Sequence, residues 1–259
     1  MNIFGGNIMI LDKFRLDGKV AIVTGSDTGL GQGFSKAFVE AGAKVLGVSV
    51  VPSTATQEML GADNFQFVTA DLSTLDPIDM IISTAVEKFG HVDILVNNAG
   101  VIKREDTIDF SVESWDLVMN VNLRTLFFLS QAAAKQYMKQ GTGGKIISVA
   151  SMLSYQGGIR VPSYTASKSG VKGITMTMAN EWASKGINVN AIAPGYMATN
   201  NTKALRADAD RSEAILDRIP AGRWGTPDDI MGAAVFLASS ASDYVNGFTI
   251  AVDGGWLGR

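Results

Sequence analysis

The stretch KVAIVTGSDTGLG, residues 19–31, joins an apolar, β-branched run to a cluster of glycines. Its first part, Lys19–Thr24, predicts a buried strand, and helical spacing over Gly31–Ala41, stopped by Gly42, predicts the helix that follows. Glycines between a strand and a helix let the backbone come close to a pyrophosphate, which the free amides at the helix N-terminus attract. The spacing is TGxxxGxG and not the usual GxGxxG, and the alternative is a tight turn that binds nothing. Its position in a βαβ unit favours a dinucleotide site.

The alternation of strand and helix continues to the end of the chain. Further strands are predicted at Lys44–Val50, Phe65–Ala70, Asp93–Val96, Lys145–Val149, Ile187–Ile192 and Thr249–Val252. Helices are predicted at Pro77–Phe89, Val112–Gln140, Tyr164–Ser184 and Pro227–Ala238. Strands that alternate with helices form a parallel sheet covered on both faces. The predicted fold is therefore α/β, a single doubly wound Rossmann-type domain with a mostly seven-stranded parallel sheet.

The domain organisation follows from where this rhythm begins and where it breaks. Residues 1–15 precede it and are predicted to be an N-terminal extension, and residues 16–259 form one dinucleotide-binding catalytic domain. Residues 197–223 interrupt the rhythm with a long, charged segment directly after a strand. Ligands of such sheets bind outside the carboxyl ends of the strands, so this insertion is predicted to cover a substrate.

Composition excludes several classes of function. Hydrophobic residues make up 46% of the 259 residues, and the net charge of −3 offers no basic surface for nucleic acid. The chain has no cysteine and a single histidine, His91, so disulfides, thiol catalysis and a metal site are not expected. We find no apolar run long enough to cross a membrane and no signal peptide, which predicts a cytoplasmic protein without a membrane partner.

A second group of residues carries acid–base chemistry. Tyr164 and Lys168 are four residues apart, so a helix places them on one face, and Ser151 lies at the end of a neighbouring strand. A free tyrosine has a pKa of about 10, and a nearby ammonium or another positive charge favours its phenolate. A hydroxyl such as that of Ser151 can donate a hydrogen bond to a reacting oxygen. The alternative for Tyr164 and Lys168 alone is two solvated residues on a helix face.

These motifs, taken in order, resemble the short-chain dehydrogenase/reductase family. The resemblance extends from about residue 16 to residue 255 and rests on TGxxxGxG, on Asn97-Asn98-Ala99-Gly100, on Ser151 thirteen residues before Tyr164, and on Pro194-Gly195. It implies that Asn122, Ser151, Tyr164 and Lys168 are catalytic: Tyr164 exchanges the proton, Ser151 orients the carbonyl, Lys168 holds the nicotinamide ribose, and Asn122 supports a water relay.

The resemblance also implies a nicotinamide cofactor and the residues that bind it. They are Gly25, Asp27, Thr28, Gly29, Leu30, Gly31, Ser49, Asp71, Leu72, Asn98, Ala99, Gly100, Val121, Tyr164, Lys168, Pro194, Gly195, Met197 and Thr199. Asp71 and Leu72 are expected at the adenine, and Thr199 at the carboxamide or pyrophosphate.

The choice between the two nicotinamide dinucleotides depends on the end of the second strand. Ser49 stands where many family members that use NAD have an aspartate, yet no arginine or lysine lies there for a 2′-phosphate. Asp27 in the glycine turn would repel a 2′-phosphate. We therefore expect NAD, with NADP as the less favoured cofactor.

The substrate is predicted from the arginines and from a narrower resemblance. Several segments, among them residues 151–164 and 193–208, resemble family members that act on deoxy sugar acids of the 2-dehydro-3-deoxy-D-gluconate type in uronate or pectin catabolism. Guanidinium groups suit a carboxylate. Ser151, Tyr164, Arg104, Gln156, Arg160 and Arg206 are the expected substrate residues, and solvated surface charge is the alternative for each arginine.

Two rival enzymes and one non-enzyme stay open. The enzymes are a gluconate 5-dehydrogenase and a 3-oxoacyl-carrier-protein reductase, and the non-enzyme is a catalytically idle dinucleotide sensor. Because a sensor needs no proton donor, the set Asn122, Ser151, Tyr164 and Lys168 argues against it. Family resemblance further implies a homotetramer, formed by apolar faces of the helices over Val112–Gln140 and Tyr164–Ser184 and by residues near Trp256.

Overall fold

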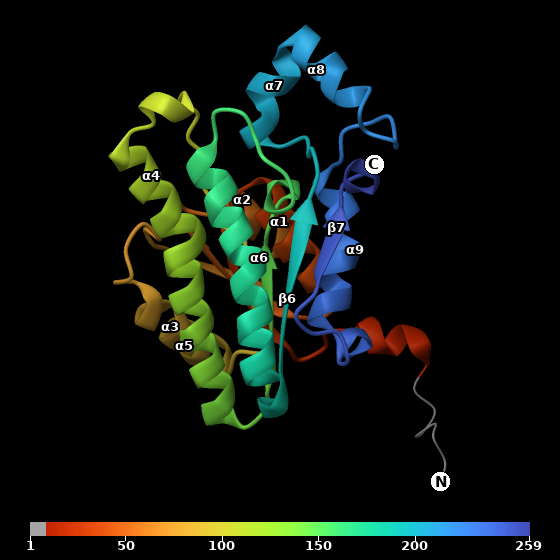
Figure 1. Ribbon diagram of the computed structural model, residues 1–259. Coiled ribbons are helices and arrows are strands. Elements are labelled where there is room, and N and C mark those ends of the chain that lie inside the picture. Colours follow the sequence, from red (N-terminus) through yellow and green to blue (C-terminus); the bar gives the residue numbers. More distant parts are fainter. Residues whose placement is uncertain (1–8) are drawn as a thin grey trace.

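The computed structural model describes residues 9–259 and contains the predicted sheet at its centre (Figure 1). Its strands are β1 (Val20–Thr24), β2 (Lys44–Ser49), β3 (Phe65–Thr69), β4 (Ile94–Asn97), β5 (Gly144–Val149), β6 (Ile187–Pro194) and β7 (Thr249–Val252). All neighbouring strands are parallel, in the order β3-β2-β1-β4-β5-β6-β7. The order reverses between β1 and β4, and a doubly wound sheet binds its ligand at such a switch point. The fold prediction is confirmed.

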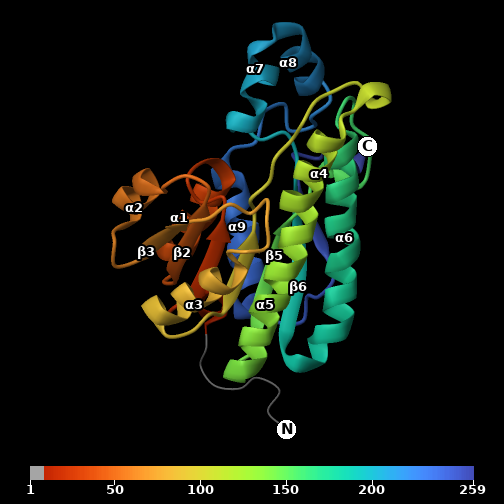
Figure 2. The same cartoon turned by 90° about the vertical axis from the view of Figure 1, so that its left-hand side faces the viewer.

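Helices cover both faces of the sheet. On one face lie α3 (Ile78–Phe89), α5 (Thr125–Gln140) and α6 (Pro162–Trp182), and on the other lie α1 (Gly29–Glu40) and α9 (Pro227–Ala238) (Figure 2). In β1, Ile22 packs toward the first group, whereas Ala21 and Val23 pack toward the second. Every residue of β1 is buried, which explains its continuous apolar sequence.

Two regions before β5 differ from the sequence prediction. A short helix that was not predicted, α2 (Thr54–Leu60), lies between β2 and β3. The helix predicted over Val112–Gln140 is divided into α4 (Val112–Met119), a π-helical segment η3 (Asn120–Arg124) and α5. Such π segments are rare in proteins, and those that occur often lie at functional sites. Hydrophobic periodicity alone does not reveal one, because the helix axis continues through it.

The segment predicted as an insertion contains helices of its own. It includes the 3₁₀ turn η6 (Asn200–Thr202), α7 (Lys203–Ala207) and α8 (Ala209–Leu216), which lie beyond the carboxyl ends of the strands (Figure 1). Met197 pairs with Gly225 as an isolated bridge, and the amide of Ala198 donates to the carbonyl oxygen of Gly225 at 2.7 Å. The two ends of the segment are therefore joined at its base.

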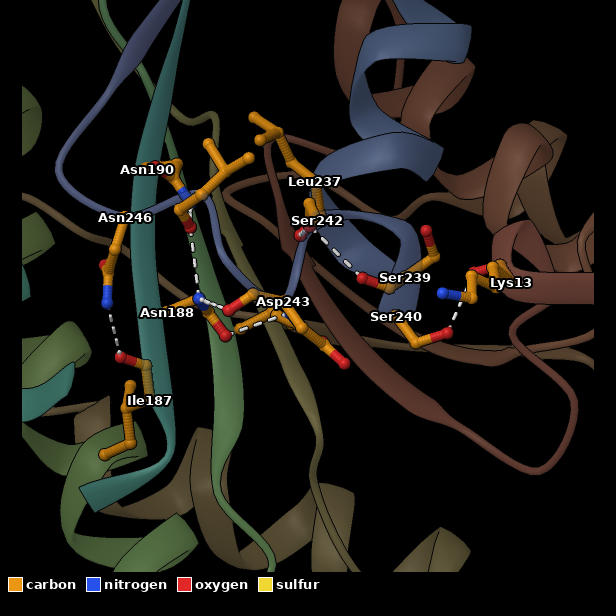
Figure 3. A network of polar contacts seen from close by, with 12 residues as sticks. Lys13, Ile187, Asn188, Asn190, Leu237, Ser239, Ser240, Ser242, Asp243 and Asn246 are labelled. Atoms are coloured by element: carbon orange, nitrogen blue, oxygen red, sulfur yellow. Dashed lines mark hydrogen bonds and ion pairs between the residues drawn. The ribbon is translucent and has the colours of Figure 1, made fainter. Parts of the chain in front are cut away.

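At the opposite edge of the sheet, asparagines fix the chain that leads into β7. The amide of Asn190 donates to Val245 O at 2.9 Å, and its carbonyl accepts from Phe248 N at 3.0 Å. Asn188 donates to Asp243 O and Val245 O, and Asn246 donates to Ile187 O (Figure 3). This network holds residues 243–248 against β6 and so sets the register of the last strand.

The N-terminal part that the structure describes rests on this same side of the molecule. The 3₁₀ turn η1 (Ile10–Phe14) places the ring of Phe14 6.2 Å from that of Phe236, and Ser240 donates to Lys13 O. The remainder of the predicted extension, residues 1–8, lies outside the described residues. No helix within residues 9–259 combines the length and apolarity that crossing a membrane requires.

Candidate active site

The glycine turn has the geometry that its sequence predicts. Gly25 and Gly29 have φ angles of 67° and 60°, which side chains with a Cβ rarely adopt. A Cβ on Gly31 would lie 1.9 Å from the carbonyl oxygen of Gly25, so no other residue fits at this position. The hydroxyl of Thr24 accepts from the amides of Asn98 and Ala99, both at 2.9 Å. The turns after β1 and β4 are thereby fixed against each other.

The N-terminus of α1 is open toward a cleft. Its first flanking residue, Thr28, makes no side-chain cap, so the amides of the first turn are free to bind an anion. Gly25 and residues 27–30 line one wall of the cleft, and residues between Pro194, at the end of β6, and Thr202 contribute to the other. The amide nitrogen of Asn200 lies 3.5 Å from the hydroxyl of Thr28 across it.

The predicted acid–base residues line the same cleft. Ser151, Tyr164 and Lys168 all face it, and both Ser151 and Lys168 are almost fully buried. Lys168 Nζ donates to Val149 O at 2.6 Å and lies 5.7 Å from the centre of the Tyr164 ring. The hydroxyl of Ser154 donates to Lys168 O at 2.6 Å, which ties η4 (Met152–Ser154) to α6. The helix therefore presents Tyr164 and Lys168 toward the glycine turn, as their spacing predicts.

Burial dominates the electrostatics of this pair. It lowers the pKa of Lys168 to about 8 from an ordinary value of 10.5. Burial also raises the pKa of Tyr164, against the opposing effects of its hydrogen bond with Ser151 and of the charge on Arg104. The sequence predicts that the ammonium of Lys168 favours the phenolate. Within the protein alone, the larger effect on Tyr164 is desolvation.

Asn122 lies behind these residues and not in the cleft wall. It belongs to the π segment η3, is fully buried, and forms a closed pair of hydrogen bonds with Val101: Val101 N donates to its Oδ1 at 2.8 Å, and its Nδ2 donates to Val101 O at 2.9 Å. Its Nδ2 also lies 3.2 Å from the hydroxyl of Ser167, which donates to Tyr164 O. Asn122 thus connects the turn after β4 with the helix that carries Tyr164.

A group of buried hydroxyls lies at the far end of the glycine turn, and one of them, that of Ser49, contacts the carboxylate of Asp27. Ser49 Oγ donates to Asp27 Oδ1 at 2.9 Å and accepts from Asp27 N at 3.2 Å. Ser26 Oγ lies 3.0 Å from Ser53 Oγ, and Thr56 Oγ1 donates to Ser26 O at 2.8 Å. Ser49 is buried and lies behind Asp27, so the carboxylate is the group that this end of the cleft presents.

Most predicted cofactor residues meet in this one cleft. Those that line it are Gly25, Asp27, Thr28, Gly29, Leu30, Asn98, Ala99, Gly100, Tyr164, Lys168, Pro194, Gly195, Met197 and Thr199. Gly31 and Ser49 lie behind its wall, and Val121 lies in η3 beside Asn122. Asp71 and Leu72 follow β3; Asp71 accepts from Ser73 N at 2.8 Å, which lowers the pKa of its carboxyl, and Leu72 is buried in the core.

The predicted substrate arginines differ in what they bind. Arg160 Nε lies 2.7 Å from Asp106 Oδ1, and Arg206 donates to Thr199 O at 3.2 Å. Within residues 9–259, Arg104 forms no ion pair. Its positive charge lowers the pKa of Tyr164. Neither these arginines nor Gln156 line the cofactor cleft.

Some residues of the site were not predicted. Val149, Ala150, Asn200 and Thr202 line the cleft. Their positions next to Ser151 and Thr199 are the only signal that the sequence offers. Ser154 and Ser167 lie close to Ser151 and Lys168 in the sequence, but nothing there predicts that their hydroxyls hold α6 in place.

Comparisons with known proteins agree with this geometry. The family model described as enoyl-(acyl carrier protein) reductase matches residues 25–257. The 2-dehydro-3-deoxy-D-gluconate 5-dehydrogenase of Escherichia coli is 64% identical over 253 residues, which cover 97% of this chain and 100% of the relative. That of Bacillus subtilis is 55% identical over 96% of this chain and 98% of the relative.

A solved structure is similar over nearly its whole length. The crystal structure of a candidate 2-deoxy-D-gluconate 3-dehydrogenase from Agrobacterium tumefaciens, with bound NADP, has a TM-score of 0.88 and 52% identity, and the match covers 95% of this chain and 99% of that one. Fold, motif positions and sequence identity agree over almost the entire length. The chain belongs to the short-chain dehydrogenase/reductase family.

Proposed function

We propose that this protein is an NAD(H)-dependent oxidoreductase that interconverts a hydroxyl and a ketone on a deoxy sugar acid of the 2-dehydro-3-deoxy-D-gluconate type, in the breakdown of uronates or pectin. The observation that carries the proposal is that Tyr164, Ser151 and Lys168 share one cleft with the glycine turn. The names of the relatives with 64% and 55% identity supply the substrate class.

The cleft has the donors that a nicotinamide dinucleotide needs. The uncapped N-terminus of α1 offers backbone amides to a pyrophosphate, and Gly25 and Gly29 leave room for it. Lys168 would hold the nicotinamide ribose, and Pro194–Thr199 would enclose the other side. When bound, the cofactor supplies the hydride chemistry.

Tyr164 is the group that exchanges the proton with the substrate oxygen. In ketone reduction its hydroxyl donates to the developing alkoxide, and in oxidation its phenolate accepts from the alcohol. Ser151 faces the same space and donates a hydrogen bond to the reacting oxygen, which stabilises negative charge there. A positive charge brought in with the oxidised cofactor opposes the desolvation that raises the pKa of Tyr164.

Lys168 and Asn122 prepare this proton transfer. Burial holds the pKa of Lys168 at about 8, so the amine can give and take a proton near neutral pH. Asn122 holds the turn at Val101 in place and, through Ser167, contacts the carbonyl of Tyr164. We assign to it the support of a water relay behind Lys168.

Asp27 favours NAD over NADP in this proposal. Its carboxylate is fixed by Ser49 at the end of the cleft where the adenosine ribose would lie, and it would repel a 2′-phosphate. No arginine or lysine follows β2 before α2 to attract one. The related Agrobacterium protein was solved with NADP. The ratio of kcat/KM for the two cofactors therefore tests this part of the proposal separately.

Arg104 is the arginine best suited to the carboxylate of the substrate. Its charge acts on Tyr164 and it has no acidic partner among the described residues, whereas Asp106 neutralises Arg160. Arg206 and Gln156 lie on segments that flank the site, α7 and the turn after η4, and would contact the remaining hydroxyls. The segment 197–223 covers the bound substrate.

A panel assay tests the function and separates its rivals. Purified protein is mixed with NADH or NADPH and, in parallel, with a 5-keto deoxy sugar acid, 5-ketogluconate or a 3-oxoacyl thioester, and the absorbance of the reduced cofactor is followed. We expect the highest kcat/KM with the deoxy sugar acid and NADH. A preference for 5-ketogluconate or the thioester would support a rival enzyme, and binding without turnover of any substrate would support the sensor.

We also propose a homotetramer. Exposed apolar side chains occur on both predicted helices, with Phe128 37% exposed on α5 and Met176 46% exposed on α6, and Phe248 beside β7 is 59% exposed. Such side chains suit an interface between copies of the chain. Light scattering at micromolar concentration should give four times the mass of one chain, and a monomeric mass would contradict the proposal.

A further inference from the structure

Glu105 occupies a position between three segments of the substrate side. Its carboxylate accepts from Ser111 N at 2.8 Å, from Ser111 Oγ at 3.2 Å and from Ser114 Oγ. Ser111 is the N-cap of α4, so the negative charge lies at the positive end of that helix. These contacts lower the pKa of the Glu105 carboxyl, the hydrogen bond from Ser114 most of all. The loop after β4 is thereby fixed to the start of α4.

The backbone of Glu105 binds the segment that precedes Tyr164. Its amide donates to Arg160 O at 3.1 Å, and next to it the side chains of Asp106 and Arg160 pair at 2.7 Å. Arg160 has a φ of 64°, which is uncommon for a residue with a side chain. In this conformation the carbonyl of Arg160 points toward the amide of Glu105. Only Val161 and the first turn of α6 separate Arg160 from Tyr164.

Arg104 stands between two fixed points. Three residues before it, Val101 is bound by Asn122 through two hydrogen bonds, and directly after it Glu105 is bound to α4 and to Arg160. The loop from Val101 to Glu105 is therefore held at both ends. Its one arginine, Arg104, forms no ion pair with another residue of the described range 9–259, although the chain on both sides of it is held by hydrogen bonds.

We propose that Glu105 is a positioning residue that holds Arg104 at a set distance from Tyr164 and thereby decides which carbon of a bound sugar acid reaches the reacting position. The inference rests on the proposed function, because it takes the carboxylate of the substrate to bind Arg104. With one end of a linear sugar acid anchored there, the distance from Arg104 to Tyr164 selects the carbon that Tyr164 serves. Arg160 contributes through its carbonyl oxygen, as part of this link between Glu105 and α6.

The hydrogen bonds of Glu105 outweigh the ion pair beside it. Hydrogen bonds to an ionised carboxylate are stronger than neutral ones, and here three of them converge on one side chain. The pair between Asp106 and Arg160 is more than half exposed on both sides, and such pairs contribute little. Removal of the Glu105 carboxylate should therefore have the larger effect on the substrate.

A double-mutant cycle between Glu105 and Arg104 tests the inference. Glu105→Ala should raise KM for the deoxy sugar acid by about tenfold, the effect of losing a charge-assisted contact, with a smaller change in kcat. In an Arg104→Gln background the same change should raise KM by less than about twofold, because the anchor that Glu105 positions is already gone. Glu105→Gln, which keeps one acceptor oxygen, should give an intermediate KM.

Two comparisons separate positioning from general stability. The methyl ester of the same sugar acid has no carboxylate, so its KM should respond weakly to Glu105→Ala. Asp106→Asn removes the charge that pairs with Arg160 and leaves the carbonyl of Arg160 in place, and it should change KM for the acid by less than about threefold. NADH affinity, measured by fluorescence titration, should stay unchanged in all variants. If Glu105→Ala does not fold, Ser114→Ala removes one of the same hydrogen bonds and replaces it in the cycle.

Each outcome decides the inference. Equal KM increases for Glu105→Ala in both backgrounds, or equal increases for acid and ester, would show a structural role only and overturn it. An unchanged KM for the acid would overturn it as well. A wild-type enzyme that turns over no sugar acid would overturn the proposed function first and the inference with it, so the two failures are distinguishable.

Discussion

The two edges of the sheet both concentrate buried polar side chains, but these side chains differ in how completely they are satisfied. At the amino-terminal side of β6, the side-chain amides of Asn190 and Asn188 donate to backbone carbonyls of residues 243–245 (Figure 3). At the carboxyl edge, Lys168 Nζ donates to Val149 O and to no other residue that the structure describes, and it faces a cleft. A satisfied buried network stabilises a fold, whereas an incompletely satisfied charge costs stability and is available for chemistry. Substitutions at the two edges should therefore separate activity from stability.

The largest expected effect belongs to Tyr164. Tyr164→Phe removes the hydroxyl that we propose as the proton donor and keeps the ring, so kcat should fall by about a thousandfold, the scale of general acid–base catalysis. The melting temperature should stay within a few degrees of the wild type, because Ser151, which loses its hydrogen bond with Tyr164, still accepts from Leu153 N. Steady-state kinetics and thermal unfolding on the same preparation measure both. A variant that kept its turnover would show that Tyr164 is not the proton donor.

Asn122 lies behind the cleft, but its side chain is fully buried and hydrogen-bonded like that of Asn190. Its replacement should therefore affect activity and stability together. Asn122→Ala leaves the amide and carbonyl of Val101 without their partners in the interior. We expect kcat to fall by about a hundredfold and unfolding free energy to fall by about 2 kcal/mol. Asn122→Asp keeps one acceptor and serves as the matched control. A loss of activity without any loss of stability would contradict the double role.

The amino-terminal edge should show the opposite of Tyr164. Asn190 is 1% exposed, and Asn190→Ala leaves Phe248 N without its acceptor and removes one of the two amide donors to Val245 O, the other being Asn188. The unfolding free energy should fall by about 2 kcal/mol, while kcat/KM at 25 °C stays within about twofold of the wild type. Urea unfolding with a parallel activity assay checks both. A strong loss of kcat/KM in a folded variant would mean that the two edges are coupled.

The sequence predicts much of the carboxyl edge and little of the rest, for physical reasons. Strand periodicity and glycine turns are local, and a parallel sheet brings its strand ends together, so Tyr164, Ser151 and the glycine turn could be placed in advance. The hydrogen bond from Glu105 N to Arg160 O and the side-chain contacts of Asn190 join segments distant in sequence, and their partners are backbone atoms, which carry no sequence signal. Arg104 and Arg160 look alike in the sequence. Only the position of Asp106 distinguishes them.

The stability cost of the buried Lys168 ammonium should appear in the pH dependence of the free energy of unfolding. Burial lowers its pKa from 10.5 to about 8, so the folded protein bears the full cost of the buried charge below pH 8. Between pH 8 and 10.5 the unfolded chain binds the proton and the folded one does not, so stability rises with pH in that window and levels off above it. Lys168→Met should therefore be more stable than the wild type at pH 7, by roughly 1–2 kcal/mol after the lost bond to Val149 is counted. The difference should shrink as pH rises toward 10.5. A difference that does not change with pH would exclude a buried ammonium as its cause.

The smallest expected effect concerns Asp27, where the cleft meets a satisfied hydroxyl network. Asp27→Asn removes the charge but keeps an oxygen that can accept from Ser49 Oγ, so the hydroxyl network around Ser26 should stay intact. Without the repulsion, the kcat/KM ratio of NAD to NADP should shift toward NADP by roughly fivefold, or about 1 kcal/mol, with little change in melting temperature. Ser49→Ala removes the residue that fixes the carboxylate and keeps the charge, so it should shift the ratio less. If both variants left the ratio unchanged, the choice between NAD and NADP would not depend on the Asp27 carboxylate. The carboxylate would then have a structural role only, like the asparagine network at the opposite edge of the sheet.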